Sequence, residues 1–117
     1  NHWGHKVVIT SDHGTVRVDK PARVKADRST STGIRYKFGR NIHVDKRFAL
    51  TANDPTSYRL PKDNLTSNYI FAHGRYFFVY PNEYRKFTNR FQDSFQHGGI
   101  SMEEMIIPVG TLIGKGS

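Results

Sequence analysis

The sequence predicts an α/β fold built from short strands and a single substantial helix. Short apolar or alternating runs bounded by turn residues recur along the chain, as expected for strands. Aromatic residues recur every three or four positions near residues 82–95, the spacing of a helix that packs against a core. An apolar run near residues 105–112 predicts a final strand. Because the chain has 117 residues, we expect residues 1–117 to form one domain or subdomain.

The chain is strongly basic and lacks cysteine. Its net charge of +8 and pI of about 10.0 favour a phosphate or nucleic-acid partner; the alternatives are a solubilising surface or one covered by an acidic neighbouring domain. Without cysteine, a metal must be bound by His, Asp, Glu or backbone oxygen, and a reducing, cytoplasmic compartment is expected. No apolar run approaches the roughly 20 residues that span a bilayer, so we expect no membrane partner.

The first elements are two short strands followed by a polar loop. Residues 5–10 (HKVVIT) predict a buried strand, because β-branched residues follow one another there. Residues 15–18 (TVRV) alternate and predict a second strand, which ends at Asp19-Lys20-Pro21. The polar and basic composition of residues 21–33 then predicts a loop.

Residues 34–39 (IRYKFG) have the alternation of a strand with one buried face. The apolar positions Ile34, Tyr36 and Phe38 alternate with two basic positions, Arg35 and Lys37. Residues 40–67 are weakly patterned and carry several turn signals. Two aromatic runs follow over residues 68–81, separated by Ala72-His73-Gly74, and they predict a pair of antiparallel strands with a tight connection.

The helix predicted near residues 82–95 has Asn82 as a candidate cap and an aromatic stripe, made of Tyr84, Phe87, Phe91 and Phe95. We interpret this stripe as a core face rather than as a platform for stacking bases. Further along, Ser101 and Glu104 have the spacing of a capping box and predict one helical turn. Pro108 lies within the final predicted strand and argues for an edge or a bulge there.

The segment VVITSDHG, residues 7–14, is the first candidate functional site. Asp12, His13 and the following glycine suit an ordinary hairpin turn, which the residues alone favour, and they also permit a metal site at the end of a strand. His97 is the second candidate, because it too precedes glycine at the end of a predicted element. The remaining histidines are interpreted as surface or structural residues: His2, His5, His43 and His73.

Two segments resemble the alkaline phosphatase superfamily. VVITSDHGT is similar to the Asp-His-Gly loop that closes a central strand, and FQHGGISMEEMIIPVGTL is similar to the C-terminal His-Gly-Gly segment of PglZ-type domains. RYFFVYPNEYRKFTNRFQDSF resembles the PglZ-type domain of PorX-like response regulators in type IX secretion. The resemblance implies an alkaline-phosphatase-like α/β fold of which this chain is the C-terminal portion.

The resemblance also implies a two-metal site that binds a phosphate or sulfate ester. Asp12 and His13 would bind the metal that activates the nucleophile, and His97 would bind its companion, with zinc as the expected ion. The family's nucleophile and its other ligands have no counterpart here. We therefore expect the chain to be inactive alone, with the missing N-terminal part of the same domain as its partner. The expected role is an effector domain in two-component signalling.

We expect four basic residues to contact a phosphate ester or nucleotide substrate: Arg28, Arg35, Lys37 and Arg40. Open sheet edges in such a portion of a domain also predict self-association, including a homodimer. The main alternative function is a basic, non-enzymatic module that binds nucleic acid or an acidic partner domain. A PglZ-type domain that has lost catalysis and serves for docking is a further hypothesis.

Overall fold

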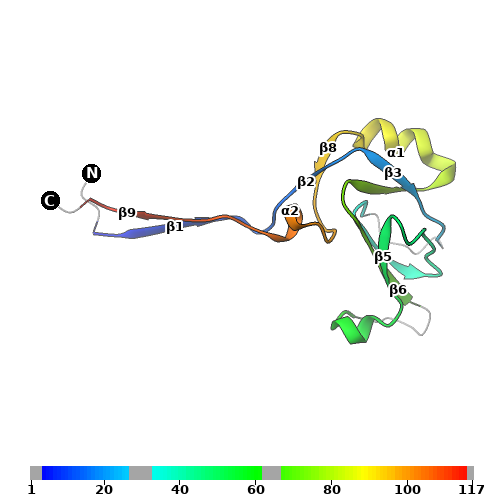
Figure 1. The fold of residues 1–117 in the computed structure, drawn as a ribbon, viewed down its shortest axis with the longest axis horizontal. Helices are drawn as coiled ribbons and strands as arrows, with labels where there is room; N and C mark the ends of the chain where they lie inside the picture. Colours follow the sequence, from blue (N-terminus) through cyan, green and yellow to red (C-terminus); the bar gives the residue numbers. More distant parts are fainter. Residues whose placement is uncertain (1–3, 27–32, 62–66, 116–117) are drawn as a thin grey trace.

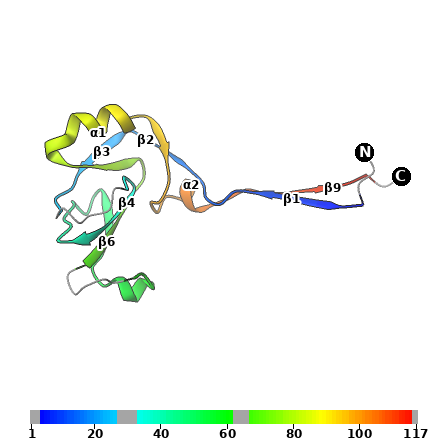
Figure 2. The ribbon, with the colours of Figure 1, turned by 180° about the vertical axis from the view of Figure 1, so that it is seen from behind.

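The computed structural model describes residues 4–26, 33–61 and 67–115, and it shows an elongated molecule of 63 × 34 × 22 Å. Strands β1 (Lys6–Thr10) and β9 (Val109–Ile113) form an antiparallel pair. Figures 1 and 2 show this pair, called the arm below, projecting away from a body that holds the other elements. The chain is thus a mixed α/β chain in which strands outnumber helices.

The arm exposes apolar side chains on both faces. Val8 is 59% exposed on one face and Ile9 57% exposed on the other, and Ile113 opposite Lys6 is 75% exposed. The prediction of a buried strand over residues 5–10 is therefore wrong as to burial, although the strand itself is present. The run of β-branched residues favours an extended backbone, but no described residue packs over it.

The arm continues into the body through a second antiparallel pair, β2 (Val16–Val18) with β8 (Ser94–Gln96). Val16 and Val18 are buried there. The final strand begins one residue after Pro108, whose carbonyl accepts a hydrogen bond of 2.8 Å from Thr10 Oγ1. Proline thus precedes the ladder instead of interrupting it.

The pairing of the remaining strands differs from the predicted hairpin. Strand β6 (Ser67–Ala72) lies between β4 (Tyr36–Arg40) and β5 (Ala49–Ala52) in an antiparallel sheet. Strand β7 (Tyr76–Val79) instead pairs in parallel with β3 (Lys20–Arg23). The antiparallel β6–β7 hairpin is therefore wrong. The loop predicted over residues 21–33 is wrong at its start, because β3 spans Lys20–Arg23, and residues 27–32 of that loop lie outside the described residues. Pro21 does not prevent this pairing.

The buried face of β4 is opposite to the predicted one. Arg35, just before the strand, and Lys37 within it are both fully buried, whereas Tyr36 is 39% exposed. Alternation correctly indicated a strand, but it placed the basic side chains outside. The basic pair is accommodated because Arg35 meets a buried carboxylate and Lys37 lies over the Tyr80 ring, 4.6 Å from its centroid.

Two apolar clusters form the core of the body. One gathers residues of β3, β5, β6 and β7, among them Ala22, Ile70 and Phe78. In the other, helix α1 (Tyr84–Phe91) packs Tyr84, Phe87 and Phe91 against buried residues that include Val18, Phe77 and Val79. The core role of the aromatic stripe is confirmed for these three residues. Phe95 lies in β8 and is 68% exposed, because the helix ends at Phe91.

Short helical turns complete the described chain. Pro55–Tyr58 and Pro81–Glu83 are 3-10 helices, the second leading directly into α1. Helix α2 (Met102–Met105) has Ser101 as its N-cap, so the predicted capping box is confirmed. Among the described residues, no helix has the length and apolar character required to cross a membrane.

Candidate metal centre

The arm and the β2–β8 pair are two parts of one antiparallel ribbon that is interrupted once. Thr10 pairs with Val109 at the end of the arm, and Val16 pairs with Gln96 where pairing resumes. Residues 11–15 must therefore lie opposite residues 97–108. This register brings the Asp-His-Gly and His-Gly-Gly segments together although they are more than eighty residues apart in the sequence.

The two histidines predicted as ligands touch each other across this interruption. The ring of His13 stacks on that of His97, with ring centroids 3.7 Å apart and planes inclined by 18°. Asp12 Oδ1 lies 3.4 Å from His13 Nε2, and the Asp12 side chain is 89% exposed. The structure thus places all three sequence-predicted metal ligands at one point of the ribbon.

His13 is held by its own loop in an orientation suited to a ligand. Its Nδ1 lies 2.8 Å from the carbonyl oxygen of Gly14. A carbonyl only accepts, so Nδ1 donates its hydrogen in this contact, and the neutral ring then presents the lone pair of Nε2. Histidine ligands commonly donate their second N–H to a backbone carbonyl in this way. Ser11 Oγ donates to the His13 carbonyl at 3.0 Å and further defines the loop.

Helix α2 is part of the longer loop, residues 97–108, and lies directly against the shorter loop, residues 11–15. The backbone N–H of Gly14 donates to the carbonyl of Glu104 at 2.8 Å. A Cβ at position 14 would lie 1.9 Å from the carbonyl oxygen of Glu103, so only glycine fits here. The glycine of the Asp-His-Gly segment is therefore required by a close approach between two backbones.

The side chain of Glu104 organises the longer loop. Its carboxylate accepts hydrogen bonds from Gly99 N at 3.0 Å, Ser101 N at 3.0 Å and Ser101 Oγ at 2.6 Å. It also forms a buried, bidentate pair with Arg35, at 2.6 Å to Nε and 2.5 Å to Nη2. Burial by itself raises the pKa of Glu104, but the hydrogen bonds from Arg35, Ser101 and Gly99 outweigh it and hold the pKa below its usual value.

The four residues assigned to substrate lie in different surroundings. Arg28 lies outside the described residues. Arg35 is fully buried against Glu104, and Lys37 is fully buried with its pKa lowered to about 8 by desolvation. Arg40 is exposed at the far end of β4, about 16 Å along the strand from Arg35. The structure therefore does not gather the described three into one basic surface.

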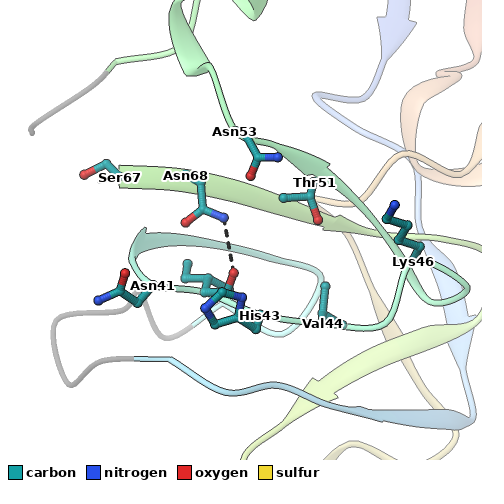
Figure 3. A pocket seen from close by; sticks show the side chains of 9 residues that line it. Asn41, His43, Val44, Lys46, Thr51, Asn53, Ser67 and Asn68 are labelled. Carbon is teal, nitrogen blue, oxygen red and sulfur yellow. Dashed lines mark hydrogen bonds between the residues drawn. The ribbon is translucent and has the colours of Figure 1, made fainter. Parts of the chain in front are cut away.

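A separate, polar pocket of about 440 Å³ lies at that far end of β4. Figure 3 shows Asn41, His43 and Val44 on one side of the pocket, opposite Asn68 of β6, with Thr51 of β5 and Asn53 just beyond it beside Asn68. Asn68 is buried there, and its Nδ2 donates to the Ile42 carbonyl at 3.3 Å. Its lining is rich in amides and includes two basic side chains: Asn41, Asn53 and Asn68, with His43 and Lys46.

Comparison with known families identifies the chain. The sequence model of the BREX system PglZ alkaline phosphatase-like domain matches residues 1–112, which include both loops of the candidate metal centre. The chain belongs to the PglZ family. This membership confirms the PglZ resemblance, and the alkaline phosphatase-like description of the family indicates a phosphohydrolase-like fold. No curated protein matches the PglZ chain significantly.

The alkaline phosphatase superfamily generally uses divalent metals. In this PglZ chain, Asp12, His13 and His97 suit such metals only as part of a larger ligand set. Over the described ranges, no group of three or more His, Asp and Glu side chains converges as a metal-binding cluster. Imidazole and carboxylate are nevertheless the ligand types that zinc prefers.

Sequence reasoning did not find the joint role of Arg35 and Glu104. The capping-box spacing pointed to Glu104 as a helix-terminal residue, which it is. That pattern carries no information about a distant arginine. A buried partner for Arg35 could have been suspected only from its place between Ile34 and Tyr36 in the predicted strand.

Proposed function

We propose that this PglZ chain supplies Asp12 and His13 from one loop and His97 from the other to the two-metal site of a phosphoester hydrolase. The contact between the His13 and His97 rings carries the proposal. Two imidazoles from distant parts of the sequence meet at the single interruption of the ribbon, one from each of its two loops.

The ring geometry favours two neighbouring ions over a single one. Rings inclined by only 18° have nearly parallel planes, so in-plane lone pairs on the two rings do not converge on one ion. Their 3.7 Å separation is close to the roughly 3.5–4 Å between the ions of two-metal sites. His13, with Asp12 beside it, and His97 therefore belong to different ions. Zinc is the proposed metal, because imidazole and carboxylate suit it.

Within the site, the residues of this chain bind and orient. His13 presents Nε2 while Gly14 fixes the ring through Nδ1, and the exposed Asp12 carboxylate adds negative charge beside it. Bound divalent ions would supply Lewis-acid polarisation of the phosphoryl oxygen. We propose that the nucleophile and the remaining ligands come from the N-terminal part of the same domain, which is the partner of this chain.

The test uses the complete PglZ domain that contains this chain. His13→Ala and His97→Ala should each lower zinc content and hydrolysis of an aryl phosphate diester, whereas His5→Ala should change neither. His5 is the control because it is an exposed histidine directly before β1, outside both the candidate metal centre and the pocket. Metal content is measured by mass spectrometry on desalted protein. Unchanged zinc content and turnover in His97→Ala would falsify the ligand assignment.

We propose further that the domain is an effector of PorX-like response regulators in the cytoplasm. The resemblance of residues 75–95 to those domains supports this role. Hydrolysis by the parent polypeptide should change when a receiver domain in that polypeptide is phosphorylated. A parent with no receiver domain would contradict the proposal.

The polar pocket supports a second candidate function, the binding of a nucleotide or a short single-stranded nucleic acid. Its amides offer donors and acceptors of the kind that read base edges, and Lys46 and His43 add basic groups. Binding of a labelled oligonucleotide should then weaken with salt, resist chelator and decrease in Asn68→Ala. Binding that chelator abolishes would instead belong to the metal centre.

A further inference from the structure

One residue of helix α2 contacts both loops of the candidate metal centre. The Glu104 carbonyl accepts the N–H of Gly14, next to His13, at 2.8 Å. The Glu104 carboxylate accepts the N–H of Gly99, two residues after His97, at 3.0 Å. Main chain and side chain of Glu104 thus bind one loop each.

Both oxygens of the buried Glu104 carboxylate accept hydrogen bonds. Its side chain is 1% exposed, and it receives hydrogen bonds from the backbone of Gly99, from the backbone and hydroxyl of Ser101, and from Arg35. A buried carboxylate with this many donors has one stable position. The lowered pKa of Glu104 means that it remains ionised at neutral pH and keeps all of its donors.

Arg35 connects this carboxylate to the body of the molecule. Its Nη1 donates to the carbonyl of Tyr76, the first residue of β7, at 2.5 Å, while Nε and Nη2 face Glu104. The guanidinium also occupies the space beside Gly99, where a Cβ would lie 2.6 Å from Nη2. The longer loop is therefore packed closely against an arginine fixed by the core.

From these contacts we infer that Glu104, held by Arg35, is the positioning residue that keeps His13 and His97 in ring contact. The inference rests on the proposed function for its consequence, since it explains how the chain presents two histidines to two neighbouring ions. Arg35 acts through Glu104 and not on substrate. Both glycines lie where a side chain has no space: a Cβ at Gly99 would meet the Arg35 guanidinium, and one at Gly14 would meet the backbone of α2 at Glu103.

The first experiment observes the two rings in the 117-residue chain without metal. In the unaltered chain, nuclear Overhauser effects between the His13 and His97 rings are expected at a centroid separation of 3.7 Å. Glu104→Gln removes the charge that attracts Arg35, and Glu104→Asp keeps the charge but withdraws it by one methylene. Both should lose the ring-to-ring effects while amide signals of β4, β5 and β6 keep their positions.

Glu103→Gln is the matched control, because Glu103 is the neighbouring, exposed glutamate of the same helix. It should leave the ring contact unchanged. A purely stabilising role for Glu104 predicts lower stability with the ring contact retained. Retention of that contact in folded Glu104→Gln and Glu104→Asp would overturn the inference.

The second experiment measures zinc binding by the complete PglZ domain. Loss of a residue that orients metal ligands typically weakens binding about 10- to 100-fold, and this loss is expected for Glu104→Gln but not for Glu103→Gln. If His97→Ala leaves zinc binding intact while Glu104→Gln separates the rings, the proposed function fails and the positioning role stands. If zinc binding needs His97 but neither glutamate variant affects it, the positioning role fails.

Discussion

Gly14→Ala tests whether the two loops are held together by close backbone packing. The new Cβ would lie 1.9 Å from the Glu103 carbonyl oxygen, 1.5 Å short of the 3.4 Å at which ordinary contact begins, and 2.9 Å from the Ile106 carbonyl oxygen. Both are backbone atoms, so no side-chain rotation relieves the clash. The loop must move away from α2 and lose the Gly14 N to Glu104 O hydrogen bond of 2.8 Å.

The expected cost is the sum of two effects. Overpacking of this kind costs about 1–3 kcal/mol, and loss of one backbone hydrogen bond adds about 0.5–1.5 kcal/mol. We therefore expect the opening free energy at position 14 to fall by about 1.5–4.5 kcal/mol. Because about 1.4 kcal/mol is a factor of ten, the amide of residue 14 should exchange with deuterium roughly 10- to 1600-fold faster.

Native-state hydrogen exchange by nuclear magnetic resonance measures this rate directly. Gly110→Ala is the matched control, because the nearest atom to its Cβ is the Ile9 carbonyl oxygen at 3.9 Å. It should change stability by no more than about 0.5 kcal/mol. If Gly14→Ala exchanged at the rate of the unaltered chain and kept the His13–His97 contact, the close packing of α2 on this loop would be refuted.

Three further predictions concern the body and the arm. Burial lowers the pKa of Lys37 to about 8 in the folded chain, from an ordinary value of 10.5. Between pH 8 and pH 10.5, Lys37 is therefore protonated in the unfolded chain and deprotonated in the folded chain. As the pH rises through this window, the free energy of unfolding should increase by at most about 3 kcal/mol relative to that of Lys37→Met, measured by urea titration at each pH. Parallel dependence of the two unfolding free energies on pH would contradict this. Arg17→Met should cost less than about 1 kcal/mol in urea denaturation, because its 2.9 Å pair with Asp93 is about half exposed; a loss above about 2 kcal/mol would be evidence against this. Ile113→Lys should leave stability within about 0.5 kcal/mol because Ile113 is 75% exposed, and it should reduce self-association in sedimentation velocity. If the unaltered chain is monomeric at all concentrations, self-association through the exposed apolar residues of the arm is contradicted.

The features that could be predicted from the sequence depend on residues close together in the chain. The capping box requires only Ser101 and Glu104, and the aromatic stripe of α1 follows from helical spacing. Alternation over residues 34–39 likewise indicated a strand. The two loops of the candidate metal centre are related to each other by family resemblance alone, because no local pattern relates residues 12–14 to residues 97–99.

The features that were predicted wrongly depend on partners far away in the chain. Alternation defines two faces of β4 but does not say which is buried, and Glu104 and Tyr80 reverse the expectation by receiving Arg35 and Lys37. Strands β6 and β7 are close in sequence, yet each has better partners elsewhere. Such choices are decided by the total packing of the body, which short-range patterns do not contain.

By itself, the sequence determined several of the extended segments and the main helix, and which residues have the chemistry to bind metal. Local backbone preference and ligand type are properties of individual residues and their neighbours. The tertiary structure alone decided that His13 meets His97 and that Glu104 and Arg35 hold the two loops together. These contacts arise because the pairing of β1 with β9 and of β2 with β8 sets the two loops opposite each other. The buried charge of Arg35 or Glu104 is in turn stable only when its partner is also present.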